Sequence, residues 1–379
     1  MLAPSDLASH PERARLRTAI LALLERAEAR PHASFEAERD AILSEVAALQ
    51  AEHVTPFGRL CAARGARFDH GPDGWPALPT DVYRHTRVSL AAPGADRCVF
   101  RTSGTTHGAR GEHPFVELAL YHRASMIGAR LALLPEVPFD LLVIAADPAR
   151  QPDSSLGHML GLFADEARGR DPDAHVAFVL EGDHIDTSAA ARAIEHASSR
   201  GRALVLAGTS FAFVFGEDVW DRRFVLPADS RVMFTGGYKG RSRVLDEASL
   251  RAAIVARYGV REDHVLMEYG MTELCSPLWG RERIDRGSPT SQGVLWIPPW
   301  LRVTAVDPVS LAPVAEGERG LLRFDDPACL DSCVSIQTAD HGVITRLADG
   351  TRGLRLLGRD PSAVPRGCSL AIEEALTPR

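Results

Sequence analysis

Short apolar runs rich in β-branched residues alternate with helical patterns through the middle of this 379-residue chain. The apolar runs cover residues 140–146, 175–182, 202–208, 231–237 and 264–270, and the helical patterns lie near residues 116–134, 188–200 and 246–258. This alternation predicts an α/β fold in which mostly parallel strands are buried under flanking helices. Because ligands bind beyond the carboxyl ends of such strands, we expect a site at TGGYKG and YGMTE, which follow the last two runs.

The two ends of the chain have a different pattern. Residues 11–51 contain two stretches with the apolar spacing of amphipathic helices. Residues 292–357 contain shorter strand-like runs and the hairpin signal Asp349-Gly350. We therefore predict one large domain over residues 1–357, with a small β subdomain at its end, and a short tail over residues 358–379.

Composition and charge restrict the classes of partner. The chain is 45% hydrophobic and 25% charged with a net charge of −7, and no basic stretch stands out, so we do not expect a nucleic acid partner. No secretory signal and no apolar run of membrane-spanning length is visible. The six cysteines are scattered, which favours a reduced, cytoplasmic protein. Cys329 and Cys333 have helical spacing, but no second pair matches them, so we expect no metal site there.

Residues 102–111, TSGTTHGARG, combine hydroxyl side chains, glycines and a fixed cation. The hydroxyls belong to Thr102, Ser103, Thr105 and Thr106, and the first glycine is Gly104. Glycine lets backbone N–H groups approach an anion, hydroxyls can donate to phosphate oxygens, and Arg110 can bind two oxygens at once. The pattern predicts a polyphosphate-binding loop different from the P-loop, although a solvated turn would have a similar composition.

Three later segments accompany this loop: TGGYK at 235–239, MEYGMTEL at 267–274 and IQTADHG at 336–342. In this order the four segments resemble the core motifs of the adenylate-forming superfamily, which includes acyl-CoA synthetases, peptide-synthetase adenylation domains and luciferases. The resemblance covers about residues 98–370. It implies the fold of the adenylate-forming large domain, with ATP and Mg²⁺ as cofactors and a carboxylic acid as substrate.

The resemblance also implies roles for single residues. Loop 102–111 would bind the β- and γ-phosphates, with Arg110 in place of the usual Lys and His107 in place of the usual Gly. Glu273 would contact Mg²⁺, and Thr272 would lie over the α-phosphate. The adenine would be bound by Tyr269 and Gly270 of the YGMTE motif and by the two glycines of TGGYKG, Gly236 and Gly237.

Two further positions match nucleotide contacts of the superfamily. Asp340 of QTADHG would accept hydrogen bonds from both ribose hydroxyls, because a carboxylate can accept from two donors at once. The alternative is a turn aspartate before His341-Gly342. Arg359, in the segment GRD, matches a hinge arginine that contacts the nucleotide.

Among the branches of the superfamily, the chain most resembles the LuxE-type acyl-protein synthetases. We expect it to lack the full mobile C-terminal domain, and the sequence has no lysine after Lys239. It carries SSLGHM at 154–159 and ends in a tail containing Arg366-Gly367-Cys368. The resemblance implies that Cys368 receives the acyl group from the adenylate, and a flexible tail would carry it to and from the site. The alternative for this cysteine is a small buried residue.

The resemblance implies a medium or long fatty acid, with the apolar segment 207–215 near the acyl tunnel, and an acyl-CoA-reductase-like protein as the acyl acceptor. Two alternatives stay open. The chain could be a ligase that transfers the acyl group to coenzyme A or a carrier protein. It could also be a non-catalytic nucleotide-binding relative, which His107 and Arg110 favour and which Glu273 and Asp340 oppose.

Overall fold

The computed structural model describes residues 10–102, 109–182, 184–220, 222–236, 246–284, 293–347, 350–359 and 366–377, with residues 366–370 described by their backbone alone. The chain divides into two compact units. The first unit consists of Met1–Ser125, Met271–Ser276 and Ile297–Arg379, and the second consists of Met126–Gly270 and Pro277–Trp296. None of the described helices is both long and apolar enough to cross a bilayer.

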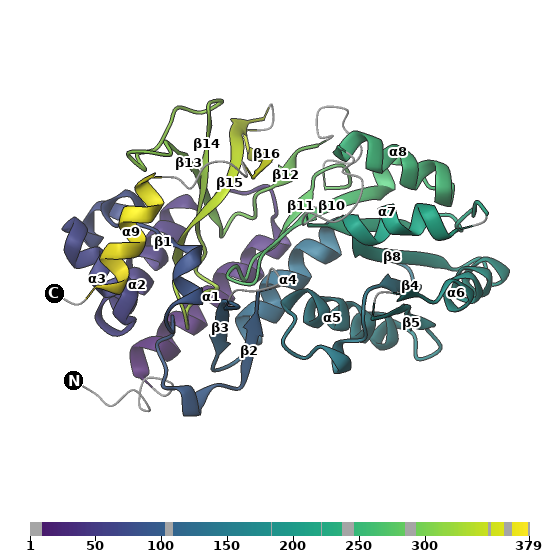
Figure 1. The fold of residues 1–379 in the computed structure, drawn as a ribbon, viewed down its shortest axis with the longest axis horizontal. Coiled ribbons are helices and arrows are strands. Elements are labelled where there is room, and N and C mark those ends of the chain that lie inside the picture. Colours follow the sequence, from purple (N-terminus) through teal and green to yellow (C-terminus); the bar gives the residue numbers. More distant parts are fainter. Residues whose placement is uncertain are drawn as a thin grey trace. The chain divides into compact units, whose positions relative to one another are not determined.

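The second unit is built on a sheet whose strands follow the order β12-β11-β10-β9-β8-β4-β5 (Figure 1). Strands β5, β4, β8, β9 and β10 are parallel to their neighbours, and β11 and β12 are antiparallel. Their bounds are β4 Phe139–Ile144, β5 Val176–Phe178, β8 Ala203–Thr209, β9 Arg231–Thr235, β10 Val265–Tyr269, β11 Leu278–Gly280 and β12 Leu295–Trp296, and a separate hairpin joins β6 Leu180–Glu181 to β7 His184–Ile185. The predicted, mostly parallel α/β sheet is therefore confirmed.

Helices cover both faces of this sheet. One face packs its apolar side chains against α6, α7 and α8 in a single core cluster. On the other face, α4 and α5 contact Trp279 of β11 through Gly128 and Phe163. The helix bounds are α4 Ala119–Ala132, α5 Ser155–Arg170, α6 Thr187–Ser199, α7 Ser210–Val219 and α8 Glu247–Tyr258, with short 3₁₀ turns at Pro148–Arg150 and Glu262–His264. The three helices predicted from the alternation correspond to α4, α6 and α8.

Side-chain caps fix where several of these helices begin. Asp186, Thr209 and Asp246 each accept a hydrogen bond from a backbone N–H of the following first turn, at α6, α7 and α8. Such caps satisfy N–H groups that have no partner inside the helix. Because α7 begins at the residue after β8 ends, the cap of Thr209 also fixes the turn at the carboxyl end of that strand.

The first unit combines N-terminal helices with an antiparallel sheet. Strands β13, β14, β15 and β16 pair in sequence order, and β1 adds to β15 in parallel. The bounds are α1 Pro11–Ala29, α2 Glu36–His53, α3 Thr55–Arg64, β1 Leu78–Pro79, β2 Cys98–Arg101, β3 Glu112–Phe115, β13 Arg302–Val306, β14 Arg319–Asp325, β15 Ser335–Arg346 and β16 Arg352–Arg359, with 3₁₀ turns at Phe68–Gly74, Thr80–Arg84 and Pro93–Ala95. The predicted helices near 11–51 and the strands after 292 are present; the predicted domain bounds stay a prediction.

Part of the tail forms a helix that the sequence analysis did not predict. Residues Arg366–Leu376 form helix α9, which packs beside α3 (Figure 1). Arg64 of α3 forms an ion pair with Glu374 at 2.6 Å, and Arg59 donates to the carbonyl oxygen of Leu376 at 3.1 Å. Ala375 is fully buried in this contact. The small side chains on one side of α9 allow close helix packing, which the sequence analysis missed.

Candidate functional site

The segment Met271–Ser276 carries two of the predicted site residues, Thr272 and Glu273, in the first unit. The side chain of Glu273 is buried, and this burial raises its pKa to about 7. The guanidinium groups of Arg84 and Arg359 act in the opposite direction, because nearby positive charge favours the ionised carboxylate. The site thus contains a desolvated carboxyl group whose charge depends on its neighbours.

The backbone of this segment is held by three other residues of the first unit. His113 Nδ1 lies 2.6 Å from the carbonyl oxygen of Thr272. The thiol of Cys329 donates to the carbonyl oxygen of Glu273 at 3.7 Å. Asp326 accepts from the N–H groups of Cys275 and Ser276 at 3.1 and 2.9 Å. Sequence analysis missed His113 and Asp326, because the contacts that give them their roles are distant in sequence.

The donor set beside Glu273 fits Mg²⁺. A carboxylate and the neighbouring hydroxyl of Thr272 are hard oxygen donors, and Mg²⁺ is commonly held by one or two carboxylates together with substrate phosphates and water. Glu273 would hold the ion once its carboxyl is ionised.

A second cluster, formed by Cys275, Asp326 and Cys329, has ligand atoms within 4.8 Å of one another. Its carboxylate already accepts from Ser276 Oγ and from three backbone N–H groups. Burial raises the pKa of both thiols, which favours protonated hydrogen-bond donors. We therefore assign this cluster a structural role. Cys333 lies outside it and donates to the carbonyl oxygen of Ser335 at 3.2 Å.

Asp340 and Arg359 lie opposite each other on β15 and β16. Arg359 Nε lies 3.1 Å from Asp340 Oδ1, and the arginine side chain is 58% exposed. The sequence analysis considered these residues separately, and the structure brings them together as an ion pair. The ion pair restricts the orientation of the carboxylate, as an acceptor for ribose hydroxyls requires.

The base of the predicted phosphate loop is partly described. Thr102 follows β2, and its hydroxyl accepts from the N–H of Gly111 at 2.8 Å. The exposed side chain of Arg110 donates to the carbonyl oxygens of Thr102 and Arg101, at 2.7 and 3.1 Å. Residues Ser103, Gly104, Thr105, Thr106 and His107 lie outside the described part of the chain. The phosphate-binding role of this loop stays a prediction.

The second unit carries the residues predicted to bind the adenine, at the carboxyl ends of β9 and β10. Tyr269 is the last residue of β10 and is buried, and Gly236 follows β9 with a φ of 71°, which favours glycine. Gly237 lies outside the described residues. A Cβ atom on Gly270 would lie 2.5 Å from a carboxyl oxygen of Glu268, so a side chain at this position would collide with it.

Glu268 was missed by the sequence analysis. Its side chain is fully enclosed, Thr235 Oγ1 donates to it, and burial raises its pKa to about 7. The signal was an acidic residue inside the apolar run HVLMEYG, directly before Tyr269. The carboxyl links the ends of two adjacent strands, because Thr235 and Glu268 are register partners.

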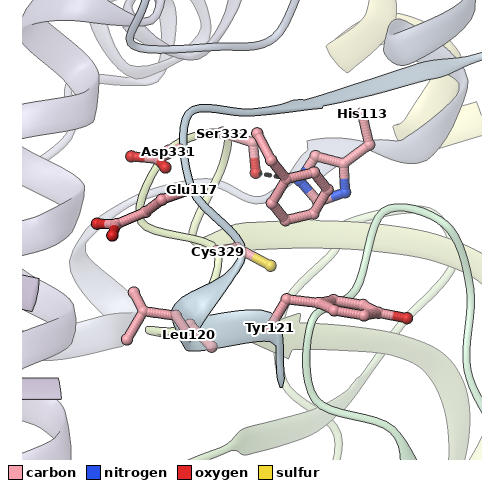
Figure 2. Close-up of a pocket in the computed structure, with 9 residues that line it drawn as sticks. His113, Glu117, Leu120, Tyr121, Cys329, Asp331 and Ser332 are labelled. Atoms are coloured by element: carbon pink, nitrogen blue, oxygen red, sulfur yellow. Dashed lines mark hydrogen bonds between the residues drawn. The ribbon is translucent and has the colours of Figure 1, made fainter. Parts of the chain in front are cut away.

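A small cavity lies next to His113 in the first unit (Figure 2). Its volume is about 10 Å³, so it can accept one water molecule but neither a nucleotide nor an acyl chain. Figure 2 shows the hydrogen bond between His113 and Ser332 on one side of it. The lining residues are His113, Phe115, Glu117, Leu120, Tyr121, Ala328, Cys329, Asp331 and Ser332. The cavity belongs to the support of Thr272 and is not a substrate site.

Cys368 is the third residue of α9, in its first turn. Burial raises the pKa of the other five cysteines, Cys61, Cys98, Cys275, Cys329 and Cys333. Those five are therefore poor nucleophiles.

Comparison with solved structures supports the fold. An open conformation of 2-hydroxyisobutyryl-CoA ligase, in complex with 2-HIB-AMP and CoA, aligns with 87% of this chain and 72% of its own at a TM-score of 0.58 and 15% identity. The same ligase in the postadenylation state gives a TM-score of 0.61 over 86% of this chain and 69% of its own, at 16% identity. At this identity the similarity establishes the fold alone.

Sequence comparison identifies the family. Long-chain-fatty-acid–luciferin-component ligases of Vibrio harveyi and Aliivibrio fischeri are 29% and 31% identical over 84 residues, which is 21% of this chain. The match spans about a fifth of the length of these curated relatives, at 22%. Residues 180–377, more than half of the chain, match the family described as acyl-protein synthetase, LuxE. This chain therefore belongs to the LuxE family of acyl-protein synthetases.

Proposed function

We propose that this chain activates a carboxylic acid with ATP. A carboxylate oxygen attacks the α-phosphorus, the bond between that phosphorus and the oxygen leading to the β-phosphate breaks, and pyrophosphate leaves. The observation that supports this reaction best is the buried carboxyl of Glu273 beside Thr272, in the family's YGMTE motif. Charge on phosphate oxygens is stabilised most strongly by fixed groups in a site from which water is excluded.

Each residue of the site has one task in this reaction. Tyr269 packs against the adenine, and Asp340, oriented by Arg359, accepts from the ribose hydroxyls. Thr272 donates its hydroxyl to the α-phosphate, and Glu273 would hold Mg²⁺. When bound, Mg²⁺ neutralises charge on the phosphate oxygens. Loop 102–111 binds the departing pyrophosphate.

The substrate that we propose is a long-chain fatty acid. This follows from family membership and from the names of the curated relatives, which are long-chain-fatty-acid ligases. The apolar helix α7 directly follows β8 and contains most of segment 207–215, which the resemblance places near the acyl tunnel. The acid would be activated by the residues described above and released only after transfer to a thiol.

For the second step we propose Cys368 as the acceptor. Its thiolate attacks the acyl carbonyl carbon, the carbon–oxygen bond to AMP breaks, and AMP leaves as a thioester forms. The family tail Arg366-Gly367-Cys368 supports this choice, and the raised pKa of each of the other five cysteines argues against them. Transfer onward to an acyl-CoA-reductase-like protein would complete the sequence.

Acid-dependent pyrophosphate release tests the first step. With ATP and Mg²⁺ present, release should rise with added fatty acid, saturate, and vary with chain length across a series of acids. Release that does not depend on any acid would support the non-catalytic nucleotide-binding alternative instead.

Protein labelling tests the second step. Incubation with ATP and labelled acid should leave label on the protein that neutral hydroxylamine releases, because a thioester is cleaved and an amide is not. Cys368→Ser should lose the label and keep pyrophosphate release, whereas Cys98→Ser, the matched control, should keep both. Rapid formation of a coenzyme A thioester without labelled protein would favour the ligase alternative.

A further inference from the structure

His113 connects the YGMTE motif with a separate loop of the first unit. It lies in β3 and is 1% exposed. Its Nδ1 is 2.6 Å from the carbonyl oxygen of Thr272, and its Nε2 is 2.7 Å from Ser332 Oγ. A carbonyl oxygen can only accept, so Nδ1 carries the proton and donates it. In the neutral ring, Nε2 then accepts from the hydroxyl of Ser332.

Packing fixes the orientation of this ring. The imidazole lies against Phe115 at a centroid distance of 4.2 Å and edge-on to Tyr83 at 5.7 Å. The adjoining cavity of about 10 Å³ is too small for the ring to turn into it. Burial lowers the pKa of His113 to about 4, so the ring stays neutral near pH 7 and keeps the same tautomer.

The loop that holds Ser332, residues 326–334, is itself anchored at two points. Gln50 of α2 donates to the carbonyl oxygens of Cys329 and Leu330, at 2.9 and 3.0 Å, and accepts from the N–H of Val334 at 2.7 Å. Arg13 of α1 bonds both carboxylate oxygens of the neighbouring Asp331, at 2.6 and 2.9 Å. Ser332 is therefore a fixed partner for the imidazole.

We propose that His113 is a positioning residue for adenylate formation: by holding the Thr272 carbonyl, it fixes the backbone from which Thr272 and Glu273 reach the nucleotide and Mg²⁺. This inference rests on the proposed function. His113 binds the carbonyl oxygen of Thr272. Further along the segment, Cys329 binds the carbonyl oxygen of Glu273 and Asp326 accepts from the N–H of Cys275. Removing a group that orients a metal ligand or a reacting group lowers the reaction rate strongly, because a small displacement weakens every contact made in the transition state.

Three substitutions separate the two hydrogen bonds of His113. His113→Leu removes both and should lower kcat for pyrophosphate release by about 10- to 100-fold, with a smaller change in KM for ATP. The amide of His113→Asn lies near the place of Nδ1 and should restore most of kcat. The amide of His113→Gln lies near the place of Nε2, reaches Ser332 instead, and should remain at least about tenfold below the Asn variant.

His264 of the second unit provides a matched control. It is also a buried histidine with Nδ1 on a carbonyl oxygen, that of Ser230 at 2.9 Å, and Nε2 on a donor, Arg283. It has no part in the site. His264→Leu should therefore lower thermal stability about as much as His113→Leu does, with kcat unchanged. A general loss of folding would affect both variants equally.

Two readouts do not depend on turnover. Nitrogen NMR of labelled histidine should show the Nδ1–H tautomer of His113 between about pH 5 and 8. Calorimetry should show that Mg²⁺ increases the affinity for ATP in the wild type and in His264→Leu. The increase in affinity should be smaller in His113→Leu. These measurements remain decisive even if no acid supports pyrophosphate release, in which case the proposed function alone would fail.

The inference is overturned if His113→Leu matches the wild type in kcat and in the increase of ATP affinity caused by Mg²⁺. It is also overturned if Mg²⁺ does not increase the ATP affinity of the wild type. A Gln variant as active as the Asn variant would also overturn it, because the bond to Ser332 would then matter more than the bond to Thr272. The Asn and Gln variants keep a polar group in the site, so this comparison survives if the Leu variant does not fold.

Discussion

Replacing Glu268 by Gln should stabilise the protein more at pH 8 than at pH 5, relative to the wild type. Burial raises the pKa of Glu268 from 4.5 to about 7. Because the folded-state pKa lies above the unfolded-state pKa, the stabilising contribution of the group is fully present below about pH 4.5 and is lost as the pH rises through about 7. At 1.36 kcal/mol for each pH unit, this loss amounts to about 3 kcal/mol.

Glutamine stays neutral at every pH and keeps an oxygen that can accept from Thr235. The advantage of Glu268→Gln in free energy of unfolding should therefore grow from about 1 kcal/mol at pH 5 to about 3 kcal/mol at pH 8. Urea unfolding at several pH values measures this difference, and hydrogen exchange of peptides from β9 and β10 locates it. Infrared spectroscopy adds a direct test, since the C=O band of a protonated carboxyl should titrate near pH 7 and be absent from the variant.

Thr235→Val provides the matched comparison. The hydroxyl of Thr235 donates to Glu268 and lowers the pKa of its carboxyl. Removing this donor should raise that pKa further and move the infrared titration to higher pH. An advantage of Glu268→Gln that stays constant between pH 5 and 8, or that shrinks, would refute the reasoning, because it would mean that the carboxylate is solvated in the folded protein.

Three further substitutions test the site and the packing. Asp340→Ala should raise the KM for ATP by about 10- to 100-fold, since a lost charged acceptor is worth about 1.5–3 kcal/mol; an unchanged KM would leave Asp340 a turn residue. Glu273→Gln should lower pyrophosphate release about 100-fold or more, and full activity would mean that Mg²⁺ is held elsewhere. Gly128→Ala should destabilise the fold by about 1–3 kcal/mol in thermal unfolding, because its Cβ would lie 2.6 Å from Trp279 Nε1. Gly161→Ala, a helical control with more space, should be neutral or stabilising, and equal stabilities would contradict the packing argument.

Much of the second unit could be predicted from the sequence. Strands β4, β8, β9 and β10 begin and end within two residues of the apolar runs that predicted them. These strands are buried on both faces, so most side chains in them are apolar and the run marks the strand directly. The helical patterns near 188–200 and 246–258 were equally clear, because each helix buries one face and starts at a capping aspartate.

The support of the site could not be predicted in the same way. The bonds of His113 to Thr272 and Ser332 join residues 159 and 219 positions apart, and no local pattern encodes such pairs. Helix α9 was missed because a short helix with a few small buried residues is stabilised by its partner α3 more than by its own sequence. The resemblance predicts which groups would touch the nucleotide, whereas the groups behind them appear only in the folded chain.

The hydrogen bonds of Gln50 and Arg13 to loop 326–334 also constrain the order in which the chain can fold during synthesis. Gln50 and Arg13 leave the ribosome early, but their partners in loop 326–334 follow 279 to 318 residues later. Until then both polar side chains must stay hydrated, so α1 and α2 cannot complete their native packing. The second unit pairs its strands over shorter separations and can fold first. We therefore expect a nascent state in which the N-terminal helices still lack the loop that completes their packing.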